Sequence, residues 1–296
     1  MDKRSLPSSL AFSDLFSRFD DYDYFDRHQK LPARWGTSAF SKNKAWWLAE
    51  LAQLSYVSDA AAIVHAFRPP GATEVTVIDV QDLRCLVVRF GASVVVAFRG
   101  TVVSRRENLF TDARVLSSAF GRRGHVHQGF YQALKSVWRP LNQVLRKRGF
   151  RYLWFTGHSL GAAMAILAAD KLADVTTGCF AYGCPRVGDK VFCKQLKVPL
   201  YRIVNNNDII DQLPPPGWYR HAGEAYYIDS KGLLWPMPGM WHRIQESYHG
   251  NMELLAKVWQ LWRAGDWQAL PFDWLNDHSP KHYSIHLWNV AQGVAG

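Results

Sequence analysis

The segment Gly157-His158-Ser159-Leu160-Gly161 has the pattern Gly-X-Ser-X-Gly, which can present a serine hydroxyl as a nucleophile. Residues 152–156 before it are aromatic and apolar, as in a buried strand, and residues 162–169 after it are strong helix formers. A serine on so sharp a turn has strained backbone angles, and the flanking glycines avoid collisions with the strand and the helix. The Leu160 N–H then lies at a helix N-terminus, where it can stabilise a developing oxyanion.

A serine nucleophile needs a base and an acid that orients the base, and in such a strand-turn-helix setting the acid comes before the histidine in the chain. Two carboxylates, Asp208 and Asp211, follow a predicted strand at residues 200–205. Catalytic groups gather at the carboxyl ends of parallel strands. We favour Asp208 because it comes almost directly after the strand, whereas Asp211 can simply begin the turn into the prolines that follow.

The histidine candidates late in the chain are His242, His249, His278, His282 and His286. We favour His278 as the base, because the Ser-Pro pair after it can cap and begin a helix, which leaves His278 in the preceding loop. His282 and His286 lie four residues apart inside that predicted helix, a spacing that could also suit a metal ion. With no acidic residue beside them, we interpret them as packing or surface residues.

The wider hydrophobic pattern describes the elements that must position these residues. Strand patterns cover residues 73–80, 83–90, 93–98, 152–156, 177–182, 200–205 and 225–229, and helical patterns cover residues 45–56, 128–148, 162–169 and about 189–197. The first strands are joined by short turns, and strands and helices then alternate. This order predicts an α/β fold, a largely parallel central sheet with helices on both faces.

We assign residues 1–44 to an N-terminal extension that includes an amphipathic helix, and residues 45–296 to a single domain. Residues 102–127 are polar, basic and irregular, and we expect no regular element there. Residues 231–276 are rich in Trp, Pro and Met around a predicted helix, and we interpret them as an insertion that covers the site.

Composition excludes several other classes of protein. Hydrophobic residues make up 48% of the chain and charged residues 20%, with no apolar run long enough to span a bilayer. No signal-peptide pattern is visible near Met1, so we expect a cytoplasmic protein. The net charge of +10 suits a solvated surface or contact with anionic lipid; no nucleic-acid-binding motif accompanies it. The four cysteines match no metal-binding spacing and are interpreted as free thiols.

Over residues 45–290 the chain resembles the class 3 lipases, the fungal-lipase-like branch of the α/β-hydrolases. The motifs that carry the resemblance occur in order at residues 96–101 (Val-Ala-Phe-Arg-Gly-Thr), 108–112, 127–130, 157–161, 183–188 (Gly-Cys-Pro-Arg-Val-Gly), 204–208 (Val-Asn-Asn-Asn-Asp), 213–215, 219–223 and 277–283 (Asp-His-Ser, ending at Tyr283). The resemblance implies an α/β-hydrolase fold. It also implies Ser159 as nucleophile, Asp208 as acid and His278 as base, with Thr101 and the Leu160 N–H as oxyanion donors.

The resemblance further implies a lid after Thr101, which we expect over about residues 102–120. Its apolar side would close over the acyl pocket, and a lipid surface would favour its opening. The chain departs from the family in two places. Residues 209–211 (Ile-Ile-Asp) replace the proline-containing stretch usual after the acid, and the Trp-rich insertion at residues 231–276 is longer than usual.

We therefore expect a carboxylic ester hydrolase that acts on acylglycerols through an acyl-enzyme and needs no metal or organic cofactor. The expected partners are a lipid ester and, at the periphery, a lipid surface; the sequence leaves the oligomeric state open. Two alternatives remain. The same residues could serve a phospholipase A1 or lysophospholipase, and a non-catalytic lipid-binding protein could keep the fold, although the presence of all the required residues disfavours the latter.

Overall fold

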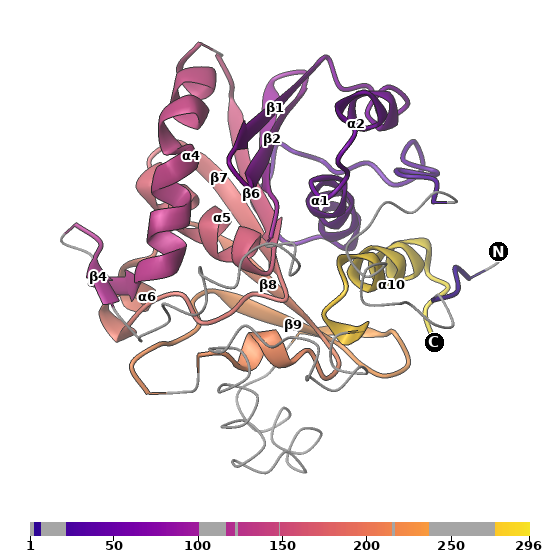
Figure 1. The fold of residues 1–296 in the computed structure, drawn as a ribbon. Helices are drawn as coiled ribbons and strands as arrows, with labels where there is room; N and C mark the ends of the chain where they lie inside the picture. Colours follow the sequence, from indigo (N-terminus) through magenta and orange to yellow (C-terminus); the bar gives the residue numbers. More distant parts are fainter. Residues whose placement is uncertain are drawn as a thin grey trace.

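The computed structural model describes residues 3–6, 22–100, 117–121, 124–147, 149–214, 217–236 and 276–296. An eight-stranded sheet in the order β1-β2-β3-β6-β7-β8-β9-β10 forms its centre (Figure 1). The strands are β1 (Glu74–Val80), β2 (Leu83–Phe90), β3 (Ser93–Phe98), β6 (Tyr152–His158), β7 (Thr176–Tyr182), β8 (Leu200–Asn205), β9 (Glu224–Ile228) and β10 (Leu234–Pro236). From β3 to β9 neighbouring strands are parallel, whereas β1, β2 and β10 pair antiparallel with their neighbours.

Helices cover both faces of this sheet, as expected for a largely parallel sheet. They are α1 (Lys42–Leu54), α2 (Ala60–Ala66), α4 (Gln128–Arg146), α5 (Leu160–Lys171), α6 (Lys190–Gln195) and α10 (Pro280–Gln292). Helices α4 and α5 lie on one side of the sheet, and α1 and α10 lie together on the other (Figure 1). Each side has its own apolar core.

Within the described residues, the strands and helices predicted from the hydrophobic pattern are present, with ends that differ by a few residues. The amphipathic helix predicted in the N-terminal extension and the helix predicted within residues 231–276 lie outside the described residues. Helix α5 is buried along almost its whole length, because its run of alanines lets it lie close to the sheet. Helix α4 instead buries one stripe, which includes Phe130, Leu134 and Leu141. No helix among the described residues is both long enough and apolar enough to span a membrane.

Several short elements among the described residues were not expected. Helix α2 follows its N-cap Asp59, β10 extends the sheet beyond β9, and a small hairpin pairs β4 (Ser117–Ala119) with β5 (His125–His127). The expectation of irregular chain across residues 102–127 is therefore wrong for the hairpin. Strands of three residues are too short to produce a recognisable alternation of apolar and polar residues, so the sequence pattern missed them.

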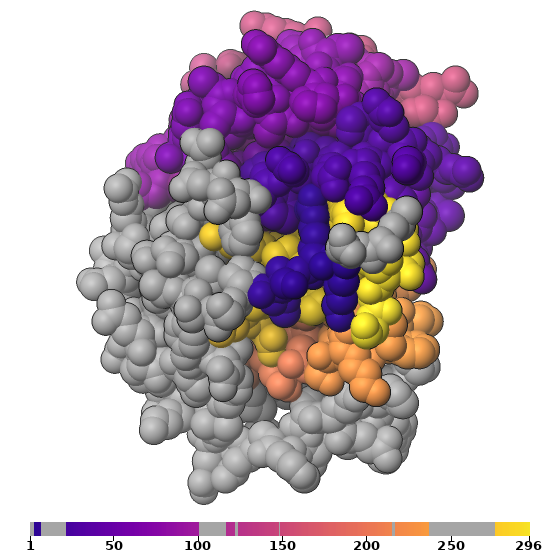
Figure 2. Space-filling view, turned by 90° about the vertical axis from the view of Figure 1, so that its right-hand side faces the viewer, coloured from indigo at the N-terminus to yellow at the C-terminus, as the bar shows by residue number. Residues whose placement is uncertain are grey.

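The N-terminal residues that the structure describes pack against the C-terminal helix. The Arg4 backbone N–H donates to Asn289 Oδ1 at 2.8 Å, and Asn289 Nδ2 donates to the Arg4 carbonyl oxygen at 2.9 Å. Figure 2 shows the indigo N-terminal residues lying across the yellow helix α10. Phe25 and Leu31, within the proposed N-terminal extension, are buried in the same core as α1 and α10. Part of that extension is thus packed onto the body.

Helix α1 carries a buried carboxyl group, Glu50, beneath this N-terminal segment. Glu50 accepts hydrogen bonds from the Tyr22 hydroxyl and from Trp46 Nε1, the latter at 2.9 Å. Burial raises the pKa of Glu50 from 4.5 to about 7, against the hydrogen bond from Tyr22 and the charge of Arg4, which lower it. The folded protein therefore holds a proton that the unfolded chain releases near pH 4.5.

Glu50 is expected to make stability depend on pH. The contribution of Glu50 to the free energy of unfolding is fully present below pH 4.5. It is lost as the pH rises to about 7, and the shift in pKa corresponds to a loss of about 3 kcal/mol. The difference in free energy of unfolding between the wild type and Glu50→Gln, measured in urea across this range, should fall as the pH rises. The same comparison with Glu74→Gln, whose side chain is 48% exposed, should show a much smaller slope. A flat Glu50 difference would contradict the prediction.

The predicted lid overlaps the described residues only at 117–120. There it forms β4, and Phe120 is only 5% exposed and contacts Tyr131 and Phe192 at ring-centroid distances of 5.1 and 5.7 Å. These four residues therefore belong to the folded body. Residues 102–116 of the predicted lid lie outside the described residues. Of the predicted insertion, residues 231–236 form the end of a turn and strand β10, and residues 237–275 also lie outside the described residues.

Phe120→Ala is expected to lower the free energy of unfolding by about 3–5 kcal/mol, the usual cost of truncating a buried phenylalanine. Urea unfolding measures this loss. Val191→Ala, at a side chain that is 47% exposed in α6, is the control and should cost much less. A loss for Phe120→Ala as small as that of the control would indicate that Phe120 belongs to a detachable segment.

Candidate active site

Ser159 lies at the turn between β6 and α5. Its backbone has φ 59° and ψ −127°, a conformation that side-chain-bearing residues rarely adopt. A Cβ atom at Gly157 would lie 2.3 Å from the Gly161 carbonyl oxygen, and one at Gly161 would lie 2.2 Å from the Phe98 carbonyl oxygen. Both glycines are therefore required by close backbone approach, as the sequence predicted.

Asp208 and His278 form a buried hydrogen-bonded pair. His278 Nδ1 is 2.9 Å from both carboxylate oxygens of Asp208, so the ring donates its Nδ1–H to the carboxylate. The two side chains are 0% and 4% exposed. The Nδ1–H donation leaves His278 Nε2 as the basic nitrogen, which is the arrangement that a general base needs.

The loop after β8 also holds the loop that carries His278. Asn205 Nδ2 donates to the Asp277 carbonyl oxygen at 3.0 Å. The Asp277 carboxylate accepts from Asn206 Nδ2 and from the Asn207 backbone N–H, each at 3.1 Å. The asparagines before Asp208 thus fix the residue before His278, although the two segments are far apart in the sequence.

Tyr283 in α10 supports the same carboxylate. Its hydroxyl donates to Asp208 Oδ2 at 2.6 Å and accepts the Asn205 backbone N–H at 3.0 Å. Burial and the neighbouring Asp208 charge raise the pKa of Tyr283, which keeps the hydroxyl protonated as a donor. The sequence analysis assigned no role to Tyr283, because only the fold brings one turn of α10 against the end of β8.

Several contacts place Ser159 at the same corner as this pair. The ring of His158, the residue before Ser159, lies 4.4 Å from the His278 ring between centroids. The Ser159 N–H donates to the Tyr182 carbonyl oxygen at 3.0 Å, and Tyr182 precedes Gly183. A Cβ atom at Gly183 would lie 2.5 Å from Asp208 Oδ2 and 2.9 Å from His278 Nδ1. The ends of β6, β7 and β8 therefore meet here.

His158 is held neutral beside the site. It shares a hydrogen bond of 2.8 Å through Nδ1 with the Tyr56 hydroxyl. Burial, and then the neighbouring His278, keep the pKa of His158 well below its usual value. A neutral His158 adds no positive charge that would oppose a proton on His278. Neither Tyr56 nor His158 was singled out as a supporting residue in the sequence.

Of the two predicted oxyanion donors, the structure describes Leu160 but not Thr101. Leu160 is the first residue of α5, so its backbone N–H is at the positive end of the helix beside Ser159. Thr101 lies outside the described residues. Gly100, which precedes it, is beside the nucleophile, since a Cβ atom there would lie 3.1 Å from Ser159 Cβ.

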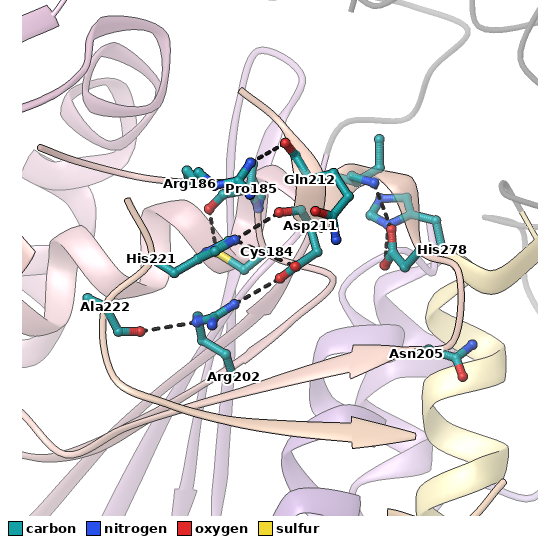
Figure 3. Close-up of polar contacts among 12 residues, drawn as sticks. Cys184, Pro185, Arg186, Arg202, Asn205, Asp211, Gln212, His221, Ala222 and His278 are labelled. Carbon is teal, nitrogen blue, oxygen red and sulfur yellow. Dashed lines mark hydrogen bonds and ion pairs between the residues drawn. The ribbon is translucent and has the colours of Figure 1, made fainter. Parts of the chain in front are cut away.

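The other residues considered as the catalytic acid or base are not part of the Ser159, Asp208 and His278 site. Asp211 pairs with Arg202 at 2.8 Å and not with a histidine of the site (Figure 3). His282 and His286 lie within α10, and burial lowers the pKa of each to about 4. Among the described residues no group of three or more His, Cys, Asp or Glu side chains could hold a metal ion. His242 and His249 lie outside the described residues.

Known proteins are similar to this chain over the segment that contains Ser159 and Asp208. Residues 95–218 match the family model described as Lipase (class 3). A lipase from Rhizomucor miehei is 34% identical over 118 residues, which are 35% of this chain and 32% of that lipase. The secreted mono- and diacylglycerol lipase 1 of Fusarium solani is 32% identical over 119 residues, 36% of this chain and 35% of that enzyme.

Residues 95–218, less than half of the chain, thus resemble the class 3 lipase family. The matches span only about a third of these two curated relatives. The family segment contains Ser159 and Asp208 but ends before His278. The place of His278 therefore rests on the structure and not on the family match.

The fold itself extends further than the sequence match. A triacylglycerol lipase whose catalytic centre is a serine protease triad superposes with a TM-score of 0.54 at 24% identity, over 65% of this chain and 83% of that one. This likeness concerns the fold alone. The chain thus has the α/β-hydrolase fold that the resemblance implied.

Proposed function

We propose that the protein is a serine carboxylic ester hydrolase that cleaves fatty acyl esters of acylglycerols through an acyl-enzyme. One observation carries the proposal: Ser159 occupies a strained turn at the start of α5, at the corner where His278 donates to the buried Asp208 carboxylate. A nucleophile, a base and an orienting acid are the groups that acyl transfer requires.

In this proposal, Ser159 Oγ attacks the ester carbonyl carbon while His278 Nε2 accepts the hydroxyl proton. Asp208 stabilises the resulting imidazolium, and the Leu160 N–H and Thr101 stabilise the oxyanion. His278 then gives the proton to the leaving alcohol, and the acyl group remains on Ser159. Water, deprotonated by His278, attacks the acyl-enzyme, and His278 returns the proton to Ser159 Oγ as the fatty acid is released.

The names of the relatives support the substrate class. The Fusarium solani enzyme is a mono- and diacylglycerol lipase, and the Rhizomucor miehei protein is a lipase. The net charge of +10 suits contact with an anionic lipid surface, because basic residues near such a surface are each stabilised by about 1 kcal/mol. Peripheral contact with lipid therefore forms part of the proposal.

A substrate panel tests the proposal. Purified protein is incubated with emulsified tri-, di- and monoacylglycerols, with phosphatidylcholine and lysophosphatidylcholine, and with a soluble short-chain ester, and released fatty acid is titrated. We expect the highest kcat/KM on an acylglycerol. Faster release from the phospholipids would favour the phospholipase alternative. Binding of lipid without hydrolysis of any ester would overturn the proposal.

A further inference from the structure

The chain immediately after Asp208 forms a short 3-10 helix, η2 (Ile209–Gln212), that contains a second buried carboxylate. Asp211 is fully buried, and its Oδ1 is 2.8 Å from Nη1 of Arg202 in β8. Arg202 is itself buried, with 6% of its side chain exposed. An ion pair is therefore enclosed three residues from the proposed catalytic acid.

A third residue completes this group. His221 Nε2 donates to the Asp211 backbone carbonyl oxygen at 2.8 Å and lies 3.5 Å from its Oδ2. Arg202 also donates through Nε to the Ala222 carbonyl oxygen at 3.1 Å. Figure 3 shows these side chains converging on η2 from β8 and from the segment before β9. We refer to Arg202, Asp211 and His221 as the Asp211 cluster.

The Asp211 cluster acts on the same turn that orients Asp208. Asp208 is the N-cap of η2, and its Oδ1 accepts the Ile210 backbone N–H at 2.9 Å. The same Oδ1 faces His278 Nδ1. A displacement of η2 would therefore rotate the Asp208 carboxylate away from the histidine that it orients.

The chemistry of the Asp211 cluster fits a geometric role. A buried ion pair adds little net stability, because removing both charges from water offsets their attraction; its better-attested use is to specify one arrangement. Residues 209–212 are Ile-Ile-Asp-Gln, so no proline restricts the backbone of η2, and the Asp211 cluster supplies side-chain contacts that can hold this turn.

We propose that the Asp211 cluster positions the Asp208 carboxylate against His278 Nδ1. Asp211 is thus a positioning residue that acts through Asp208. The effect on catalysis rests on the proposed ester hydrolase function, but the effect on the Asp208–His278 hydrogen bond does not. The two can therefore be tested separately.

Asp211→Asn keeps the size of the side chain and removes its charge. We expect kcat for ester hydrolysis to fall by about 10- to 100-fold, the loss that a misplacement of about 1 Å can cause, with little change in KM. The control is Asp79→Asn, which removes a carboxylate paired with Arg84 at 2.6 Å in the β1–β2 hairpin. Its kcat should stay at the wild-type value.

The decisive measurement is proton NMR of protein labelled with ¹⁵N-histidine. The proton that His278 Nδ1 donates to Asp208 should resonate far downfield in the wild type and in Asp79→Asn. In Asp211→Asn we expect this resonance to move upfield and to exchange faster with water. A purely structural role would lower stability and leave the resonance of the folded protein unchanged.

If Asp211→Asn does not fold, His221→Gln tests the same cluster from its rim, where the His221 side chain is 13% exposed. A smaller shift of the same resonance is then expected. An unchanged resonance and an unchanged kcat in the folded variant would overturn the proposal, as would absence of the downfield proton in the wild type. A wild type without activity on any ester would count against the proposed function only, because the resonance still decides the positioning role.

Discussion

Ser159→Ala is expected to reduce kcat for ester hydrolysis by about 10⁶-fold, the loss typical when a serine nucleophile is removed. The reason is that no other group replaces the hydroxyl that attacks the ester carbonyl. The fold should be unaffected, because alanine keeps the Cβ atom that the strained turn already accommodates. Release of fatty acid from the best substrate of the panel measures the loss.

Ser136→Ala is the matched control for this variant. Ser136 lies on the exposed side of α4, where its hydroxyl donates to the Gln132 carbonyl oxygen at 3.1 Å. Its kcat should equal that of the wild type. Ser159→Ala protein that retains more than a few per cent of the wild-type rate, after purification from any contaminating esterase, would exclude Ser159 as the nucleophile.

His278→Ala is expected to cost nearly as much as Ser159→Ala, because without a base the serine hydroxyl keeps its proton. His282→Ala is the matched comparison. Both histidines are buried, at 3% and 5% exposure, but only His278 donates to a carboxylate. His282→Ala should therefore keep a kcat close to the wild-type value when the rate is normalised to folded protein.

Added imidazole sharpens this test. A free imidazole that enters the space left by the ring can accept the serine proton, so it should restore part of the activity of His278→Ala. It should not restore Ser159→Ala, in which the nucleophile itself is missing. A larger loss in His282→Ala than in His278→Ala would show that the base has been assigned to the wrong residue.

The local parts of the fold were accessible from the sequence. The continuous apolar runs at β3 and β6 predict strands buried on both faces, and the run of strong helix formers predicts α5. The turn at Ser159 was also predictable, because its glycines are demanded by contacts within a few residues or across the neighbouring strand. Short elements such as β4 and β10 lack enough residues to show a period, and their existence depends on the partner strand.

Which of Asp208 and Asp211 orients the catalytic histidine depends on contacts between residues that are far apart in the sequence. Both carboxylates follow β8, and position alone favoured Asp208 only by its closeness to the strand. In the folded chain Asp208 lies against His278, whereas Asp211 turns toward Arg202. The partners that separate the two are distant in sequence: the Asp208–His278 hydrogen bond joins residues 70 positions apart.

The sequence by itself determined the class of the sheet, the turn that exposes Ser159 and the order of serine, acid and histidine. These features arise from local sterics, burial periodicity and motif spacing, all of which act along the chain. Only the tertiary structure decided which groups support the Asp208–His278 pair: Tyr283 from α10, which donates to the Asp208 carboxylate, and the asparagines that hold Asp277. It also decided that Asp211, on the turn after Asp208, pairs with Arg202. Hydrogen bonds and ion pairs act over a few ångströms in space, so they become visible only when the packing of β8 against α10 brings their donors and acceptors together.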